Sequence, residues 1–298
     1  MSPFSKHNTG SIACVVDTET TFIAKNPRLV FHFGAVMGDL EQENQFKPYT
    51  MDYYVKEVME DVENLLHRNN KGEAYGYNKA LAKAQFDMVN NPLKIRKWKH
   101  IVEEWNDMMS SMGVNYLTSY NFNFDIGIKD KVGTIRKTHQ QITDKTFYLP
   151  RGVDVCCLMD IAGTMFMNRN YRNFIQGLSE DDIQQMRTDK GNPKYSAEAC
   201  MRFLNKDVYY KEQHTALRDS LLEFQLFSHF WRKWKATIKK DFVNDIRGVS
   251  LKNIKEGVSI KDRLKLRRGE TVLPKKKKTK QNDPSKAREN ALQMEMPL

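Results

Sequence analysis

A short apolar segment that ends in acidic residues constrains the fold of this 298-residue chain more than any other feature. Residues 12–16 are uninterrupted apolar sequence, which is typical of a strand buried in the middle of a sheet. They run directly into Asp17-Thr-Glu19-Thr-Thr21. Side chains two residues apart in a strand point the same way, so Asp17 and Glu19 are placed to share one cation. Carboxylates at the end of a buried strand are costly without a positive partner, which favours a metal site.

Two further Asp-x-Glu triplets show that position matters more than the triplet itself. Asp39 and Glu41 follow an expected strand but lead into a turn, and Asp61 and Glu63 lie in a polar, helical stretch. Neither pair ends an all-apolar strand, so neither is expected to need a cation.

A third acidic residue, Asp125, follows the expected buried strand 116–120. It closes the segment Asn121-Phe-Asn-Phe-Asp125. Taken alone, Asp125 is more typical of an ordinary turn than of a metal site, and Phe122 and Phe124 are more typical of a core than of base stacking.

His214 and Asp219 stand where an apolar helix, expected over 217–234, begins. Five residues is poor spacing for one helix face, so we expect Thr215 to cap the helix and His214 to lie in the preceding loop. An imidazole on a loop can reach a site and act as a general base near neutral pH. His139 and Asp144 have the same spacing, but no apolar helix follows them.

Four carboxylates and a histidine suit hydrolysis of a phosphodiester with two divalent cations. Such ions activate a water and stabilise the leaving oxygen. Clustered carboxylates repel one another unless cations neutralise them, and Mg²⁺ or Mn²⁺ prefer oxygen ligands.

The rest of the chain predicts an α/β domain over residues 8–240. Further strands are expected at 28–37, 53–55 and 153–159, and a helix capped by Ser196 at 196–204. Residues 57–112 have helical spacing and are expected to form a helical insertion, within which 77–88 and 95–112 are the apolar helices. A C-terminal helical extension is expected at 241–268 and a flexible basic tail at 269–298.

The positive charge is concentrated near the C-terminus. The net charge is +11, and residues 252–298, with 14 Lys/Arg and six Asp/Glu, carry +8, which leaves +3 for the first 251 residues. The run Lys275-Lys276-Lys277-Lys278 predicts either an electrostatic arm for nucleic acid or a localisation signal; a tail that only aids solubility is the third possibility.

Two absences narrow the cellular setting. No apolar run reaches the ~18 residues of a membrane span, and the first residues lack a hydrophobic leader, so we expect no membrane and a cytoplasmic location. A nuclear location follows instead if Lys275–Lys278 is a localisation signal. Cys14, Cys156, Cys157 and Cys200 have no C-x-x-C spacing, which predicts buried, reduced thiols.

Three segments together resemble the motifs of the DEDDh 3′–5′ exonucleases, a family that includes proofreading subunits, oligoribonuclease and RNase T. They are Asp17-Thr-Glu-Thr-Thr21, Asn121-Phe-Asn-Phe-Asp125 and His214-Thr-Ala-Leu-Arg-Asp219. The similarity covers roughly residues 10–230, in the family's order. Thr215 stands where a tyrosine-type member would have tyrosine, which favours the histidine subtype.

The resemblance implies an RNase H-like mixed β-sheet flanked by helices, and roles for the matching residues. Asp17, Glu19 and Asp219 would hold one Mg²⁺ or Mn²⁺ ion, Asp17 and Asp125 a second, and His214 would deprotonate the attacking water. The backbone near Thr20 and Thr21 would meet the terminal nucleotide, with Phe22 and Asn121 beside it.

The implied function is removal of nucleoside 5′-monophosphates from the 3′ end of single-stranded DNA, in replication or repair. Two alternatives stay open: an exoribonuclease, and a non-catalytic module that binds nucleic acid or a polymerase. Phe22 departs from the glycine that the family often has there, and the long stretch between the first two motifs is a second departure.

Overall fold

The computed structural model describes residues 10–21, 28–42, 47–60, 66–68, 74–77, 84, 86–87, 89–127, 132–150, 152–165 and 169–243. All of them lie in the first of two compact units, Met1–Ile260; the second is Lys261–Leu298. Residues 244–298 lie outside the described residues. The basic tail with Lys275–Lys278, and all but the start of the C-terminal extension, therefore stay predictions.

The described part is built on a six-stranded mixed sheet in the order β6-β3-β2-β1-β7-β8. Neighbours β1, β2 and β3 are antiparallel, whereas β1, β7 and β8 run parallel, as do β3 and β6. The mixed α/β sheet that the sequence predicts is confirmed. The strands are β1 (Ile12–Thr20), β2 (Val30–Asp39), β3 (Tyr49–Val55), β6 (Ile95–Arg96), β7 (Tyr116–Ser119) and β8 (Asp154–Cys157).

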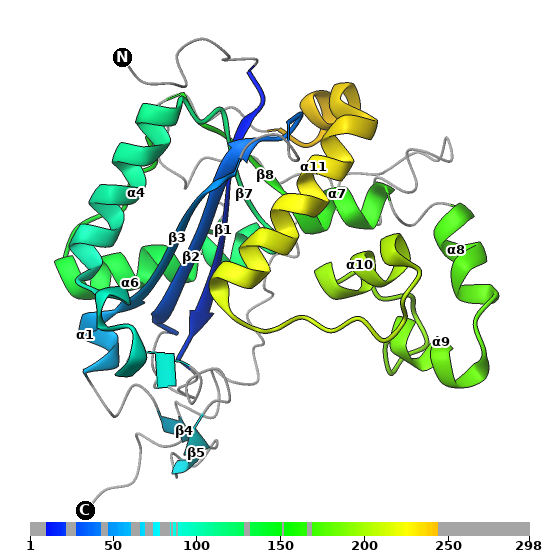
Figure 1. The fold of residues 1–298 in the computed structure, drawn as a ribbon, viewed down its shortest axis with the longest axis horizontal. Coiled ribbons are helices and arrows are strands. Elements are labelled where there is room, and N and C mark those ends of the chain that lie inside the picture. Colours follow the sequence, from blue (N-terminus) through cyan, green and yellow to red (C-terminus); the bar gives the residue numbers. More distant parts are fainter. Residues whose placement is uncertain are drawn as a thin grey trace, which may run out of the picture. The chain divides into compact units, whose positions relative to one another are not determined.

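Helices cover both faces of this sheet (Figure 1). Along β1, Cys14 and Val16 pack into one core with Trp98 and Trp105, on the face of α4 and α6. The alternate residues, such as Val15, enter a second core on the face of α11, α7 and α10. The period-2 alternation of a strand thus buries both faces of the central strand. The helices are α4 (Trp98–Met112), α6 (Thr134–Thr143), α7 (Leu158–Met165), α8 (Arg169–Gln176), α9 (Glu180–Met186), α10 (Ala197–Asn205) and α11 (Ala216–Asp241).

The region between β3 and β7 is not purely helical, which corrects the reading of residues 57–112. It begins with the short α1 (Lys56–Met59) and contains a small hairpin, β4 (Leu66–Arg68) with β5 (Ala74–Tyr77), and the single-turn η1 (Pro92–Lys94). Ile95 and Arg96, expected to begin a helix, pair with Tyr54 and Val55 as β6. Hydrogen bonding to the exposed edge of β3 overrides their helical spacing, and α4 begins only at Trp98.

Two further expectations about the chain can be compared with the structure. All four cysteines are buried and free, as predicted. None of the helices in the described ranges combines the length and apolar character needed to cross a bilayer.

Candidate active site

Three of the predicted carboxylates meet at one end of the sheet. Asp17 and Glu19 lie on β1, and Asp219 lies in the first turn of α11. One ligand oxygen from each lies within 4.8 Å of the other two. Residues that are 200 positions apart in the sequence therefore form one potential metal-binding group.

A glycine lets α11 approach this close. Gly34 on β2 lies opposite Asp17 in the antiparallel ladder. A Cβ on residue 34 would overlap the backbone of Ala216 and Leu217, at the start of α11. The missing side chain thus allows the helix to pack directly on the sheet, and the first turn carries Asp219 to Asp17 and Glu19.

Asp125 joins the group from the opposite side of β1. It ends the one-turn helix α5 (Phe122–Asp125), which follows β7, and it is 2% exposed. Its Oδ1 accepts a hydrogen bond of 2.6 Å from the Thr18 hydroxyl, which fixes the carboxylate next to β1. Burial raises the pKa of Asp125 to about 7, although this hydrogen bond opposes the shift.

The carboxylates of this group repel one another, so each disfavours the ionisation of the others. Burial, and then the carboxylates of Asp125, Glu19 and Asp219, raise the pKa of Asp17 well above its ordinary value. Burial together with Asp219 and Asp125 raises the pKa of Glu19 to about 7. Oxygen-only ligands that resist ionising together are the donor set that a hard divalent cation neutralises, so the residues present fit Mg²⁺ or Mn²⁺.

His214 lies in the loop before α11, as predicted. Its side chain is exposed, its φ is 50°, and the N-cap position of α11 is occupied by Thr215. Thr215 makes no side-chain capping hydrogen bond, so that part of the expectation is wrong. His214 is not part of the three-carboxylate group. An exposed side chain on a loop is free to turn toward a bound substrate.

The residues expected to contact the substrate differ in how far they are exposed to solvent. Thr21 is buried, and its hydroxyl accepts a hydrogen bond from the Leu29 amide, so it closes the β1–β2 pair. Thr20 is half-buried at the end of β1, and Asn121 is exposed before α5. Phe22 lies outside the described residues.

Two carboxylates near the group are absent from the sequence prediction. Glu223, 4% exposed, accepts a 3.0 Å hydrogen bond from the Tyr120 amide, just before the turn that carries Asp125. Burial, Asp17 and Asp125 raise its pKa well above the ordinary value. Glu223 follows Asp219 by four residues, so helical spacing places both on one face and could have revealed it.

The second is Glu212, in the loop that leads to His214. Burial, Asp219 and Glu198 raise its pKa to about 7, which places its carboxyl within the field of the acidic group. No apolar element precedes Glu212, so its sequence gives no comparable signal.

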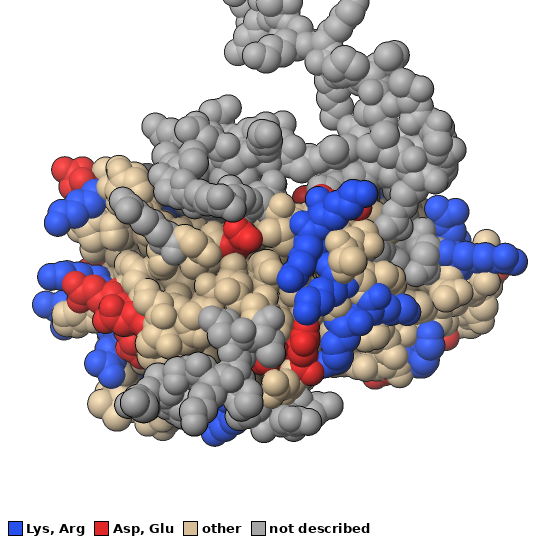
Figure 2. All heavy atoms as spheres, turned by 90° about the horizontal axis from the view of Figure 1, so that it is seen from above, with Lys and Arg blue, Asp and Glu red and all other residues tan. Residues whose placement is uncertain are grey.

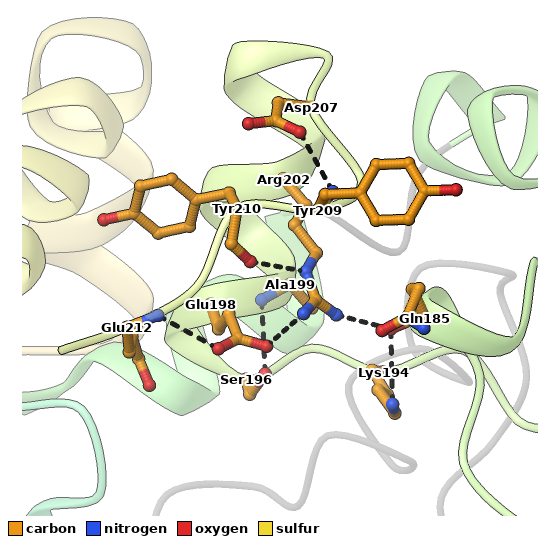
Figure 3. A network of polar contacts seen from close by, with 10 residues as sticks. All are labelled: Gln185, Lys194, Ser196, Glu198, Ala199, Arg202, Asp207, Tyr209, Tyr210 and Glu212. Carbon is orange, nitrogen blue, oxygen red and sulfur yellow. Dashed lines mark hydrogen bonds and ion pairs between the residues drawn. The ribbon is translucent and has the colours of Figure 1, made fainter. Parts of the chain in front are cut away.

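A buried arginine anchors this loop (Figure 3). Arg202, on α10, is 4% exposed; it forms a 2.5 Å ion pair with Glu198 and donates to the carbonyl oxygens of Tyr210 and Gln185. The other oxygen of Glu198 accepts from the Glu212 amide at 3.0 Å. The Glu212 side chain points away from this network. The backbone is therefore held at Tyr210 and Glu212, immediately before His214.

A band of basic side chains lies toward the end of α11 opposite to Asp219. Figure 2 shows Lys and Arg side chains in a band over the C-terminal end of α11, where Arg232, Lys233, Lys235, Lys239 and Lys240 lie. Asp219 and Arg232 are 13 residues apart on α11, or about 20 Å at the helical rise, and a kink at Trp234 follows. Acidic residues near the N-terminus and basic residues near the C-terminus also suit the helix dipole.

Several solved structures that are similar to this chain are nucleases. The nuclease domain of 3′hExo, a DEDDh family member bound to rAMP, is 12% identical with a TM-score of 0.45, over 84% of this chain and 98% of that one. Cell-death related nuclease 4 (CRN-4) is 15% identical, TM-score 0.44, over 78% and 67%. E. coli exonuclease I with a dT13 oligonucleotide is 14% identical, TM-score 0.42, over 77% and 43%.

No family model matches the sequence, and no curated protein matches it. The structural neighbours include a member of the family that the three sequence motifs resemble. At these identities and TM-scores, the chemistry of the site rests on its own residues.

Proposed function

We propose that this chain is a metal-dependent 3′–5′ exonuclease that acts on single-stranded nucleic acid, with DNA as the preferred substrate. The observation that carries the proposal is the convergence of Asp17, Glu19 and Asp219, with ligand oxygens within 4.8 Å of one another, beside the buried Asp125. Such a group has a strong electrostatic demand for cations and little structural use without them.

The donor set suits two ions. Asp17, Glu19 and Asp219 would hold one, and Asp17 with Asp125 the other. When bound, two such ions supply an activated water and stabilise the leaving oxygen of a phosphodiester.

The chain's own residues would perform the remaining steps. His214, on its exposed loop, would accept the proton of the attacking water at an imidazole nitrogen. The Arg202–Glu198 contacts hold the preceding backbone, which limits how far that loop can move. The end of β1 at Thr20 and Thr21, with Phe22 and Asn121, would position the 3′-terminal nucleotide.

A direct test uses 5′-labelled DNA and RNA strands of matched sequence, with Mg²⁺, Mn²⁺ or EDTA. We expect stepwise shortening from the 3′ end, release of nucleoside 5′-monophosphates, and no reaction in EDTA. Faster shortening of RNA would replace the DNA preference with the exoribonuclease alternative. If neither strand is shortened, the enzyme proposal fails.

Asp219→Ala separates an enzyme from a binding module that keeps the fold. The enzyme should lose turnover and remain folded, whereas a pure binder should bind nucleic acid as before.

A role in replication or repair in the cytoplasm, or in the nucleus if Lys275–Lys278 directs the chain there, is part of the same proposal. Truncation before Gly269 should flatten the salt dependence of DNA binding if the tail is an electrostatic arm.

A further inference from the structure

A cavity of about 650 Å³ lies beside the carboxylate group and has no role in the site described so far. His32 on β2 forms part of its wall and is the cross-strand partner of Glu19. Arg218, the neighbour of Asp219, forms another part, and Gln213 and Thr215 line it on either side of His214. The cavity is therefore one strand away from the proposed metal ligands. Its volume is within the range of ligand-binding sites, roughly 300–1,000 Å³.

The acidic side chains of this cavity are already paired. Asp52 accepts from Lys94 at 2.6 Å and is 2.7 Å from the ring nitrogen Nε2 of His32. Burial alone would raise the pKa of Asp52, but these two hydrogen bonds outweigh it and hold the pKa below its ordinary value. Asp87 accepts a hydrogen bond from the Tyr54 hydroxyl, and the Tyr54 ring stacks on His32 at 4.3 Å. These contacts fix the wall of the cavity. Asp52 and Asp87 already have partners, so neither is expected to bind a metal ion.

Two basic side chains of the cavity remain available. Lys47 and Arg218 are exposed, and neither makes a hydrogen bond or ion pair with another residue in the described ranges. Pro48, Leu217 and Leu221 add apolar surface beside them. Free cations next to apolar side chains complement a phosphate and the flat face of a base, which is the combination that single-stranded nucleic acid presents.

We propose that this cavity is the subsite for a nucleotide upstream of the bond that is cleaved, with its phosphate at Lys47 and Arg218. This inference rests on the proposed exonuclease function. In the proposed function, the 3′-terminal nucleotide lies at the end of β1. The rest of the nucleic-acid strand must therefore leave the carboxylates by another route. The cavity on β2 and β3 offers the neighbouring path of positive charge.

The test is binding of fluorescent ten-nucleotide DNA and RNA strands to the full chain, with Ca²⁺ in place of Mg²⁺. We expect Lys47→Gln and Arg218→Gln each to weaken Kd several-fold, for DNA and RNA alike, because the phosphate is shared. Each lost phosphate contact should lower the slope of log Kd against log salt by about 0.7. Lys190→Gln and Arg172→Gln, which change exposed residues elsewhere on the chain, are the matched controls.

Several outcomes would overturn the subsite. Kd values and salt slopes equal to those of the controls would remove it, even if the wild-type chain is an active exonuclease. A parallel loss of inhibition by a nucleoside 5′-monophosphate would show that the residues hold the terminal nucleotide instead. A wild-type chain that binds strands through Lys47 and Arg218 but shortens none would overturn the exonuclease function and leave a binding site.

Discussion

Asp17 and Gly34 face each other across the β1–β2 ladder. Because Gly34 has no side chain, the first turn of α11 can pack against β2 at this point and reach the site. The proposed metal ligand and the glycine are thus parts of one arrangement. The first turn of α11 packs on the backbone of β2, and that contact sets the position of Asp219 relative to Asp17 and Glu19.

Gly34→Ala should therefore damage both stability and metal binding. The added methyl group would overlap backbone rather than a movable side chain, and overpacking of this kind costs about 1–3 kcal/mol. We expect lower unfolding free energy in urea and a weaker Mn²⁺ affinity. Gly177→Ala is the control, since a Cβ there would meet its nearest neighbour at an ordinary 3.4 Å. Equal effects of the two changes would contradict the role of Gly34.

The raised pKa values of the carboxylates predict how stability depends on pH without metal. The ordinary pKa of Glu19 is 4.5 and its folded value is about 7, so the folded chain retains a proton that the unfolded chain has lost. The contribution of Glu19 to the free energy of unfolding is therefore fully present below pH 4.5 and is lost as the pH rises to about 7. Asp125, with a folded pKa of about 7, contributes in the same direction.

Thermal unfolding in EDTA from pH 5 to 8 measures this effect. The midpoint should fall with rising pH, and Mg²⁺ or Mn²⁺ should remove most of the decline. Glu19→Gln should flatten the curve in EDTA because one ionising group is gone. A curve that is the same with and without metal would show that no cation binds these carboxylates.

The sequence predicts the parts of this site that depend on local pattern. The apolar run before Asp17 predicts a buried strand, and the onset of the apolar helix after Thr215 places His214 in a loop; both are found. Gly34 and Arg202 are different, because their importance lies in contacts with residues distant in sequence. The pairing of Ile95 with Tyr54 is likewise set by the free edge of β3 and not by the spacing around Ile95.

Glu223 couples the helix of Asp219 to the turn of Asp125, so its two simplest substitutions should differ. Glu223→Gln keeps an acceptor for the Tyr120 amide and removes a charge near Asp17, and we expect stability at pH 8 to be retained or raised. Glu223→Leu leaves that amide unpaired and should cost about 1–3 kcal/mol. Urea unfolding at pH 8 compares them. Identical losses for both would mean that the hydrogen bond does not contribute.

Arg202 anchors the loop before His214, so its removal should reduce turnover as well as stability. Arg202→Met would leave the Glu198 carboxylate and two carbonyl oxygens without their partner, at a cost of about 3–5 kcal/mol. At a temperature where the variant remains folded, kcat should fall more than KM rises. Tyr209→Phe is the control, because it removes an exposed hydrogen bond to Asp182 from the same loop. Unchanged kcat in folded Arg202→Met would contradict the anchoring role.

His214→Asn tests the general base with little effect on the fold. His214 is exposed and has a φ of 50°, a backbone conformation that asparagine adopts more readily than alanine. We therefore expect a change in unfolding free energy within about 0.5 kcal/mol. Turnover on single-stranded DNA should fall by about 10²–10⁴-fold, the usual contribution of a positioned base. His100→Asn, at an exposed site on α4, should be silent. A variant that keeps wild-type turnover would assign proton abstraction to another group, of which Glu212 is the nearest candidate in the loop.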